Sequence, residues 1–215
     1  AAINLSGWVL IIDDGTPPDD TIITLSGVIP AGGFFLLERT DDTTVSDIPA
    51  DQIYTGGLAD AGRILSLHDP SLALIDTANG DGGPWPAGDA TLKASMERIN
   101  STVPDSDGNW ATNFGHVVNG LDVNGNPVWG TPKQPNSALV PTPTFTPTST
   151  STPTLTPTNT PLVSNTPTTL PVIVINEVVT DPQQDWSDTS GGDGVAYNNI
   201  PGNCFTCWLV DLQCL

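Results

Sequence analysis

The sequence predicts an all-β sandwich, followed by a linker and one more strand. Short runs of aliphatic, β-branched and aromatic residues alternate with turn residues at intervals of about 8–12 residues, which is typical of a sandwich. The stretch from Thr21 to Arg39 contains two such runs, separated by a Pro/Gly turn at residues 30–33. No segment shows a convincing helical repeat. We therefore expect the strands of residues 1–136 to be arranged around this strand-turn-strand pair.

The positions of the remaining strands along the sequence are predicted from the alternation of apolar and polar residues. Residues 5–12 place Trp8, Leu10 and Ile12 on one face, which indicates a strand. Residues 34–39 are too apolar to face water on both sides, so we expect them in the centre of a sheet, before a polar surface loop. Further strands are expected at residues 52–57 (a short edge strand), at 62–68 and 72–76 (a hairpin), and at 91–99.

Residues 100–136 are rich in Asn, Gly and Asp, and we expect an extended arm of turns. Trp110 and Trp129 lie within this arm. Large aromatic side chains usually bury their rings, so packing on the sandwich is favoured over stacking on a ligand.

The composition changes after the arm. Residues 137–170 are expected to form a disordered Thr/Pro-rich linker, because uncharged Thr-Pro repeats cannot bury a core. Val172–Val178 then reads as an isolated strand, followed by a tail with a different composition. Cys204 and Cys207 have the CxxC spacing of a zinc or redox site, but the second half of a zinc site is missing. We expect this tail to be aberrant or disordered, as a frameshifted reading frame would explain.

The charge of the chain excludes several kinds of partner. The formal net charge is −19, with 24 acidic and 5 basic residues. We expect no nucleic acid partner, because no basic patch exists to replace counterions on a phosphate backbone. No segment is long and apolar enough for membrane insertion. An acidic chain with few lysines suits a secreted protein, and the position of the only methionine, Met96, suggests that the sequence is a fragment.

Enzymatic chemistry has little support in the sequence. His68 and His116 lie in no recognisable catalytic motif. Ser6 and Ser26 each precede a glycine, but neither belongs to a nucleophile elbow. We therefore expect no catalytic residue, and no cofactor other than calcium.

Two acidic turns are the candidate calcium sites, since they place oxygen ligands at alternate positions. Neither completes an EF-hand, because glycine comes early and the twelfth-position Glu is missing. Asp and Asn before Gly are also ordinary turn residues. The candidate ligands are Asp105, Asp107, Asn109, Asp122, Asn124 and Asn126.

Three segments together resemble the bacterial lamin-tail domain, a module of secreted and surface proteins. They are Leu5-Ser6-Gly7-Trp8, the Ile29–Gly33 turn with Phe34–Glu38, and Leu74-Ile75-Asp76. The resemblance implies an immunoglobulin-like β-sandwich. Val172–Val178 resembles the first strand of the same domain, which precedes the other segments in the family. The implied organisation is residues 1–136 as a copy that lacks its first strands, residues 137–170 as linker, and residues 171–215 as the start of a second copy.

Two functions are consistent with this organisation. The first is a non-catalytic structural, adhesive or targeting module of a bacterial surface or secreted protein, which would contact another protein or a cell-surface glycan. The alternative is a carbohydrate- or calcium-dependent ligand-binding module that uses Trp85, Trp110 or Trp129 as a platform.

One prediction concerns the strand after the linker. A sandwich without its first strands exposes an open sheet edge, and about 30 linker residues are long enough to return Val172–Val178 to it. We expect this segment to fold back and pair with a strand within residues 5–99. The competing outcome is strand-swapped self-association with another chain.

Overall fold

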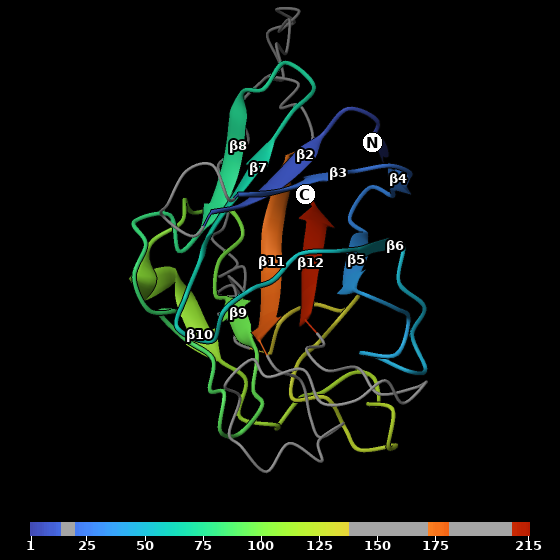
Figure 1. The fold of residues 1–215 in the computed structure, drawn as a ribbon, viewed down its shortest axis with the longest axis vertical. Coiled ribbons are helices and arrows are strands. Elements are labelled where there is room, and N and C mark those ends of the chain that lie inside the picture. Colours follow the sequence, from blue (N-terminus) through green and yellow to red (C-terminus); the bar gives the residue numbers. More distant parts are fainter. Residues whose placement is uncertain (14–19, 138–171, 181–207) are drawn as a thin grey trace, which may run out of the picture.

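A computed structural model describes residues 1–13, 20–137, 172–180 and 208–215 of the chain. Within these ranges the protein is an all-β sandwich, as the sequence predicts, with one 3-10 turn, η1 (Asp107–Asn109). The linker expected at residues 137–170 lies outside the described residues, apart from Ser137. Figure 1 shows the strands arranged as sheets that face each other across a common core.

The four-stranded sheet combines two strands from residues 9–24 with two strands from residues 64–78. It has the order β3-β2-β7-β8, and every neighbouring pair is antiparallel. Its members are β2 (Val9–Asp13), β3 (Thr21–Thr24), β7 (Ile64–His68) and β8 (Leu74–Ala78). The predicted hairpin of residues 62–68 and 72–76 is confirmed by the pairing of β7 with β8.

The six-stranded sheet combines three segments that are far apart in sequence. Its order is β10-β9-β11-β12-β5-β6. Its members are β5 (Phe34–Arg39), β6 (Gln52–Tyr54), β9 (Met96–Arg98), β10 (Trp110–Thr112), β11 (Ile173–Thr180) and β12 (Trp208–Cys214). The predicted central position of β5 and the edge position of β6 are confirmed.

The prediction of a hairpin between residues 21 and 39 is wrong. β3 belongs to the four-stranded sheet and β5 to the six-stranded sheet, while β4 (Val28–Ile29) pairs with β1 (Ile3–Asn4). The turn itself is as expected: the Gly33 N–H donates to the Pro30 carbonyl at 2.9 Å, and Gly32 has φ +65°. The chain crosses from one sheet to the other here, which is a corner of the sandwich.

The fold-back prediction is confirmed, and the expectation of an isolated strand is wrong. β11 pairs with β9, with Val178 opposite Met96, and with β12 along most of its length. β12 in turn pairs with β5, with Val210 opposite Leu37. The expectation of a disordered tail is also wrong for residues 208–215, because Leu209, Val210 and Leu212 are fully buried.

A further difference concerns residues 91–99, where a strand over the whole range was expected. Only Met96–Arg98 forms a strand, and Ala94 makes isolated bridges to Asp89 and Trp129.

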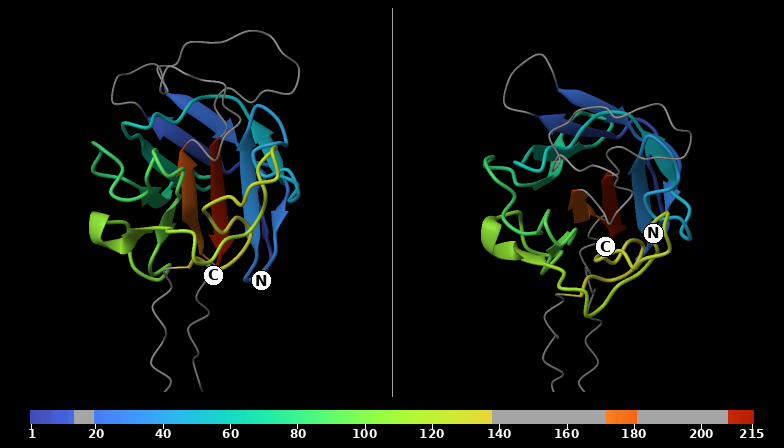
Figure 2. Two further views of the ribbon diagram at one scale, coloured as in Figure 1. Left: turned by 90° about the horizontal axis from the view of Figure 1, so that it is seen from below. Right: turned by 60° about the horizontal axis from the view of Figure 1, so that its bottom comes forward.

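The two described ends of the chain lie side by side, as Figure 2 shows, with the Cys214 thiol 3.7 Å from the Ala1 carbonyl oxygen.

The core fills the space between the two larger sheets. Leu10 and Leu67 from the four-stranded sheet meet Leu37, Val178 and Leu212 from the six-stranded sheet, and all five are buried. A smaller apolar cluster lies on the opposite face of the six-stranded sheet, beneath the loop of residues 40–51 and the arm. Its buried members are Leu36, Val45, Val128, Val179 and Leu209.

Candidate functional site

Three buried carboxylates lie in a row on the outer face of the six-stranded sheet. Glu97 on β9 is opposite Glu177 on β11, and Glu177 is opposite Asp211 on β12. We call these three residues the carboxylate cluster; none of them is exposed to solvent. Neighbouring strands are only about 4.8 Å apart, so three adjacent negative charges without water would destabilise the sheet strongly.

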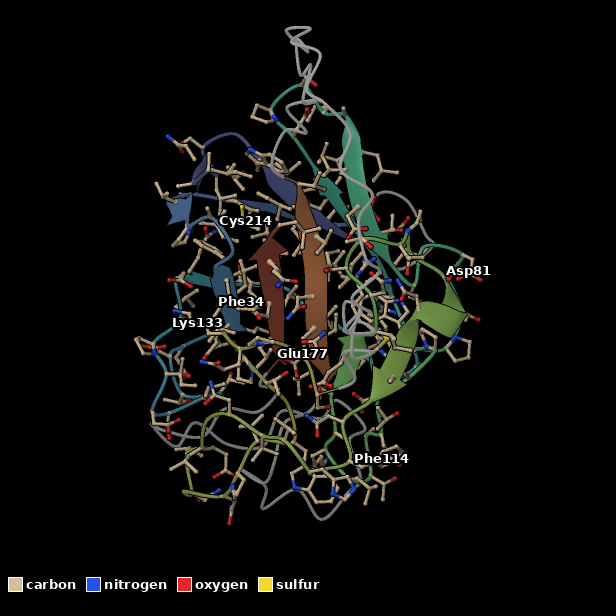
Figure 3. The ribbon with its side chains drawn as sticks, turned by 180° about the vertical axis from the view of Figure 1, so that it is seen from behind. Phe34, Asp81, Phe114, Lys133, Glu177 and Cys214 are labelled. Carbon is tan, nitrogen blue, oxygen red and sulfur yellow. The ribbon has the colours of Figure 1, made fainter. Side chains whose placement is uncertain are left out.

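The arm, from residue 113 onward and together with Ser137, lies against the carboxylate cluster and supplies hydrogen-bond donors. Figure 3 shows Glu177 on the sheet and Phe114 and Lys133 on the arm. The Thr131 N–H donates to Glu177 Oε1 at 2.8 Å, and the Thr131 hydroxyl donates to Glu97 Oε1 at 2.7 Å. Asn113 Nδ2 donates to the same Glu97 oxygen at 2.9 Å. The Ser137 N–H and hydroxyl both donate to Glu97 Oε2. The cluster therefore fastens both ends of the arm to the sheet.

Asp211 has a weaker set of partners. Its Oδ2 accepts from the Lys133 N–H and from Asn176 Nδ2, each at 3.3 Å, while Oδ1 has no hydrogen-bond partner among the described residues. The Lys133 ammonium group points elsewhere and pairs with Asp51 at 2.9 Å. No cation neutralises Asp211 within the described part of the chain, so this carboxyl depends on carrying a proton.

The cluster is held partly protonated at neutral pH. Burial, and then the neighbouring Glu97, raise the pKa of Glu177 to about 8. Burial, and then Glu177, raise the pKa of Asp211 well above its usual range. A protonated carboxyl can donate to a neighbouring carboxylate, so the row of three acids can exist without three charges.

A glycine lets the arm approach the cluster closely. A Cβ added to Gly130 would lie 2.5 Å from Glu177 Oε1, closer than a Cβ can approach an oxygen. The residue after it, Thr131, makes the hydrogen bonds to Glu97 and Glu177. Glycine at position 130 is therefore required by the contact between arm and sheet.

A second set of polar contacts holds β11 at Ile175, next to a bulge in the strand. The ladder shifts register between Ile175 and Glu177, so Asn176 is an extra residue. Asp76 Oδ2 accepts the Ile175 N–H at 2.7 Å, and the Arg98 Nε donates to the Ile175 carbonyl at 2.7 Å. The ladder between β11 and β9 covers only Glu177 and Val178, so these side chains from β8 and β9 serve as partners for the Ile175 backbone beyond it.

Arg98 is fully buried and links the two larger sheets. Its Nη2 pairs with Asp76 Oδ2 at 2.7 Å and also donates to the Thr77 carbonyl, both on β8. The guanidinium carbon lies 4.6 Å from the centroid of the Trp110 ring. Burial raises the pKa of Asp76, and the charge of Arg98 opposes that rise.

The residues expected to bind calcium fall into two separate turns and already accept protein hydrogen bonds. Asp105 accepts from Trp110 Nε1 at 2.7 Å and from the Thr77 hydroxyl and the Gly80 N–H at 2.8 Å. Asn109 is buried and closes the preceding loop through its side-chain bonds to Asn100. Asp107 begins the 3-10 turn.

In the second turn, Asp122 Oδ1 accepts the N–H groups of Asn124 and Asn126 at 2.8 Å, which is an Asx turn. Asn126 Nδ2 also donates to Asp122 Oδ2. Within the described ranges, no three His, Cys, Asp or Glu side chains are grouped so that they would hold a metal ion. Calcium binding by these turns stays a prediction.

One histidine and three tryptophans were also considered as functional residues, and the structure places them in different surroundings. His68 contacts the Leu72 carbonyl and the Ser66 hydroxyl through its ring nitrogens. Trp110 is buried, which confirms core packing and excludes it as a surface platform. Trp85 and Trp129 are half-buried, and Trp85 Nε1 donates to the Ala59 carbonyl.

The arm also carries several exposed apolar side chains. Phe114 is 62% exposed and Val117 is 52% exposed, although both belong to a segment fastened to the sheet. We use the name arm patch for the exposed apolar residues of this segment, which lies at the bottom of Figure 1. Its members are Phe114, Val117, Val118, Leu121 and Val123.

The carboxylate cluster could not be assigned from sequence reasoning alone. Glu97, Glu177 and Asp211 each follow an apolar or amide residue within a short strand, and such acids usually face water. The available signal was the position of Glu177 and Asp211 inside otherwise apolar runs, where both faces of the strand should be covered.

The fold and the site define an all-β sandwich with a buried acidic cluster beneath an external arm. No family model, curated protein or solved structure matches the chain. Among the described residues, no helix has the length and hydropathy that a bilayer span requires.

Proposed function

We propose that this chain is a non-catalytic module of an extracellular bacterial protein, and that it makes a structural or adhesive contact through the arm patch. The observation that carries the proposal is that one segment has exposed apolar side chains and is also hydrogen-bonded to the buried acids of the sheet. Phe114 and Val117 are exposed, while Asn113, Thr131 and Ser137 of the same segment bind the buried carboxylate cluster.

An anchored apolar surface is suited to binding. A contact surface that is already ordered loses little conformational entropy when it meets a partner. Exposed apolar patches on soluble domains mark interaction sites more often than they occur by chance. The net charge of −19 keeps such a surface soluble and disfavours polyanionic partners.

The lamin-tail resemblance and an immunoglobulin-like type of sandwich are part of this proposal. Their support is the placement of Val172–Val178, which resembles the first strand of that family and lies in one sheet with residues 34–39.

A second candidate is carbohydrate binding at the same end of the molecule. Trp129 favours it, because its ring lies against the backbone of Gly115, next to the exposed Phe114. Aromatic faces of this kind can pack on the apolar face of a sugar ring. This candidate shares its location with the first, but it requires a glycan ligand.

The test compares three forms of the full chain for binding to bacterial cells and to a panel of glycans, with and without calcium. In the first variant, Phe114→Asp and Val117→Asp place charges in the arm patch. In the control, Leu72→Asp changes a residue that is 70% exposed at the turn between β7 and β8, near the top of Figure 1.

We expect cell binding by the wild type and by the Leu72→Asp control, and loss of binding in the arm variant at unchanged melting temperature. Binding to one glycan class that is lost in an additional Trp129→Ala form would favour the second candidate. Equal binding by all three forms would exclude the arm patch as the contact surface.

A further inference from the structure

β11 and β12 form a pair of strands that the rest of the domain holds by non-covalent contacts and one covalent connection. In the sequence, that connection is residues 138–171. We propose that the place of this pair between β9 and β5 also accepts the β11–β12 pair of a second copy, so that copies of this chain associate by strand exchange. The proposal does not depend on the function proposed above.

Removal of the pair leaves an open slot in the sandwich. The six-stranded sheet would separate into β10-β9 and β5-β6, which have no direct contact in the strand order. β5 would lose its five register partners on β12, and the inner side chains of Phe35, Leu37 and Met96 would face the slot. Two unpaired strand edges flanking an apolar surface are a template for added strands.

The polar groups of the slot select which strands can fill it. Thr131 presents donors where Glu177 must sit, and Arg98 and Asp76 bind the backbone of Ile175. A strand without an acid at the position of Glu177 would leave the buried Thr131 N–H without an acceptor, which is unfavourable for a buried donor. The slot is therefore matched to β11 of this chain, and a second copy is the partner that carries it.

The connection is long enough for exchange. The 34 residues from 138 to 171 can span up to about 110 Å when fully extended. The closed and exchanged forms contain the same strand contacts, so their balance depends on the connection and on protein concentration.

A disulfide between two chains tests this inference directly. Gln213 on β12 lies opposite Phe34 on β5, and both are half-buried. The Cys214 N–H donates to the Gly33 carbonyl at 3.0 Å, so positions 213 and 34 form a pair of the non-hydrogen-bonded type. Such pairs have Cα atoms about 4.5 Å apart, within the range of a disulfide.

The experiment uses full-length chains in which Cys204 and Cys207 are changed to Ser and Cys214 to Ala. One chain carries Phe34→Cys and the other carries Gln213→Cys. The two chains are unfolded in urea, mixed, refolded together at increasing protein concentration and oxidised. A matched mixture combines Gln213→Cys with Ile22→Cys, which lies 64% exposed on β3 of the other sheet and reports random collisions.

We expect a disulfide-linked heterodimer in the 34/213 mixture, in a yield that rises with protein concentration and exceeds the 22/213 mixture several-fold. A single chain that carries both Phe34→Cys and Gln213→Cys should close the same disulfide within itself at low concentration. If the single chain closes its disulfide but the 34/213 mixture gives no more heterodimer than the 22/213 mixture, strand exchange is excluded. If the single chain does not close it either, the pairing of β12 with β5 is itself wrong and the proposal fails with it.

Discussion

The two larger sheets of this protein are stabilised in different ways. The four-stranded sheet consists of two pairs of strands that are each close together in sequence, β2–β3 and β7–β8, and the pairing of β2 with β7 joins them across the chain. The six-stranded sheet joins residues 34–54, 96–112 and 173–214, and it contains the buried Arg98 and the carboxylate cluster. Distant segments have no short turn to fix their register, and buried polar partners can supply that specificity.

The largest expected effect comes from breaking the link between the two sheets at Arg98. Arg98→Met should lower the free energy of unfolding by about 3–5 kcal/mol, because it leaves Asp76 buried without its cation and two carbonyls without donors. Urea denaturation measures the change.

The double variant Arg98→Met with Asp76→Leu is the control for that experiment. It removes both charges and should recover part of the lost stability. A single-variant effect below 1 kcal/mol would show that Arg98 does not bind Asp76 in the folded protein.

The next largest loss of stability is expected when a buried leucine is truncated in either of the two sheets. Leu212→Ala on β12 and Leu67→Ala on β7 each remove a fully buried side chain, so each should cost about 2–5 kcal/mol. Both leucines belong to one core, and a single unfolding transition is expected in both variants. A neutral Leu212→Ala beside a destabilising Leu67→Ala would mean that β12 does not occupy the sheet.

The carboxylate cluster should make stability depend on pH. The pKa of Glu177 is about 8 in the folded state and near 4.5 in the unfolded chain, so the folded state binds more protons between these values. The stability contributed by Glu177 is complete below about pH 4.5 and is lost as pH rises to about 8, by several kcal/mol. The pKa of Glu38, raised to about 8 by burial and then by Asp42, contributes in the same window.

The Glu177→Gln variant tests this pH dependence, when its free energy of unfolding is measured beside that of the wild type across the same pH range. The amide mimics the protonated acid, so the variant should lose part of the decline in stability between pH 5 and 8 and resemble the wild type near about pH 5. Parallel stability curves for the two proteins would contradict a protonated Glu177.

The smallest effect is expected at the outer edge of the four-stranded sheet. Ile22 on β3 is largely exposed, so Ile22→Thr should change the free energy of unfolding by less than about 0.5 kcal/mol. Thermal unfolding checks this value. A loss above 1 kcal/mol would indicate that β3 is covered by something beyond the described residues.

Local patterns were sufficient to predict much of the four-stranded sheet. The β7–β8 hairpin follows from alternation around Asp69-Pro70, because a tight turn places consecutive runs side by side. The return of Val172–Val178 was predictable for another reason: a sandwich that lacks its first strands exposes an open sheet edge, and the linker is long enough to reach it.

The partners of the distant strands could not be predicted in the same way. The Pro30–Gly33 turn suggested a hairpin, but a Pro/Gly turn fixes only the local reversal and not which strands pair beyond it. The cluster of Glu97, Glu177 and Asp211 depends on a register between strands far apart in sequence, so no local pattern reveals it. The calcium candidates were chosen by local spacing, and in Asp105 and Asp122 the same spacing serves turn hydrogen bonds.

The most direct test of the account is native-state hydrogen exchange of β11 and β12 in the full chain. The central claim is that these strands are integral members of the six-stranded sheet. We predict that their amide protons exchange only through global unfolding, with opening free energies equal to those of β2 and β7. Exchange of residues 173–180 and 209–214 at the rates of exposed loops, while β2 and β7 remain protected, would contradict the claim.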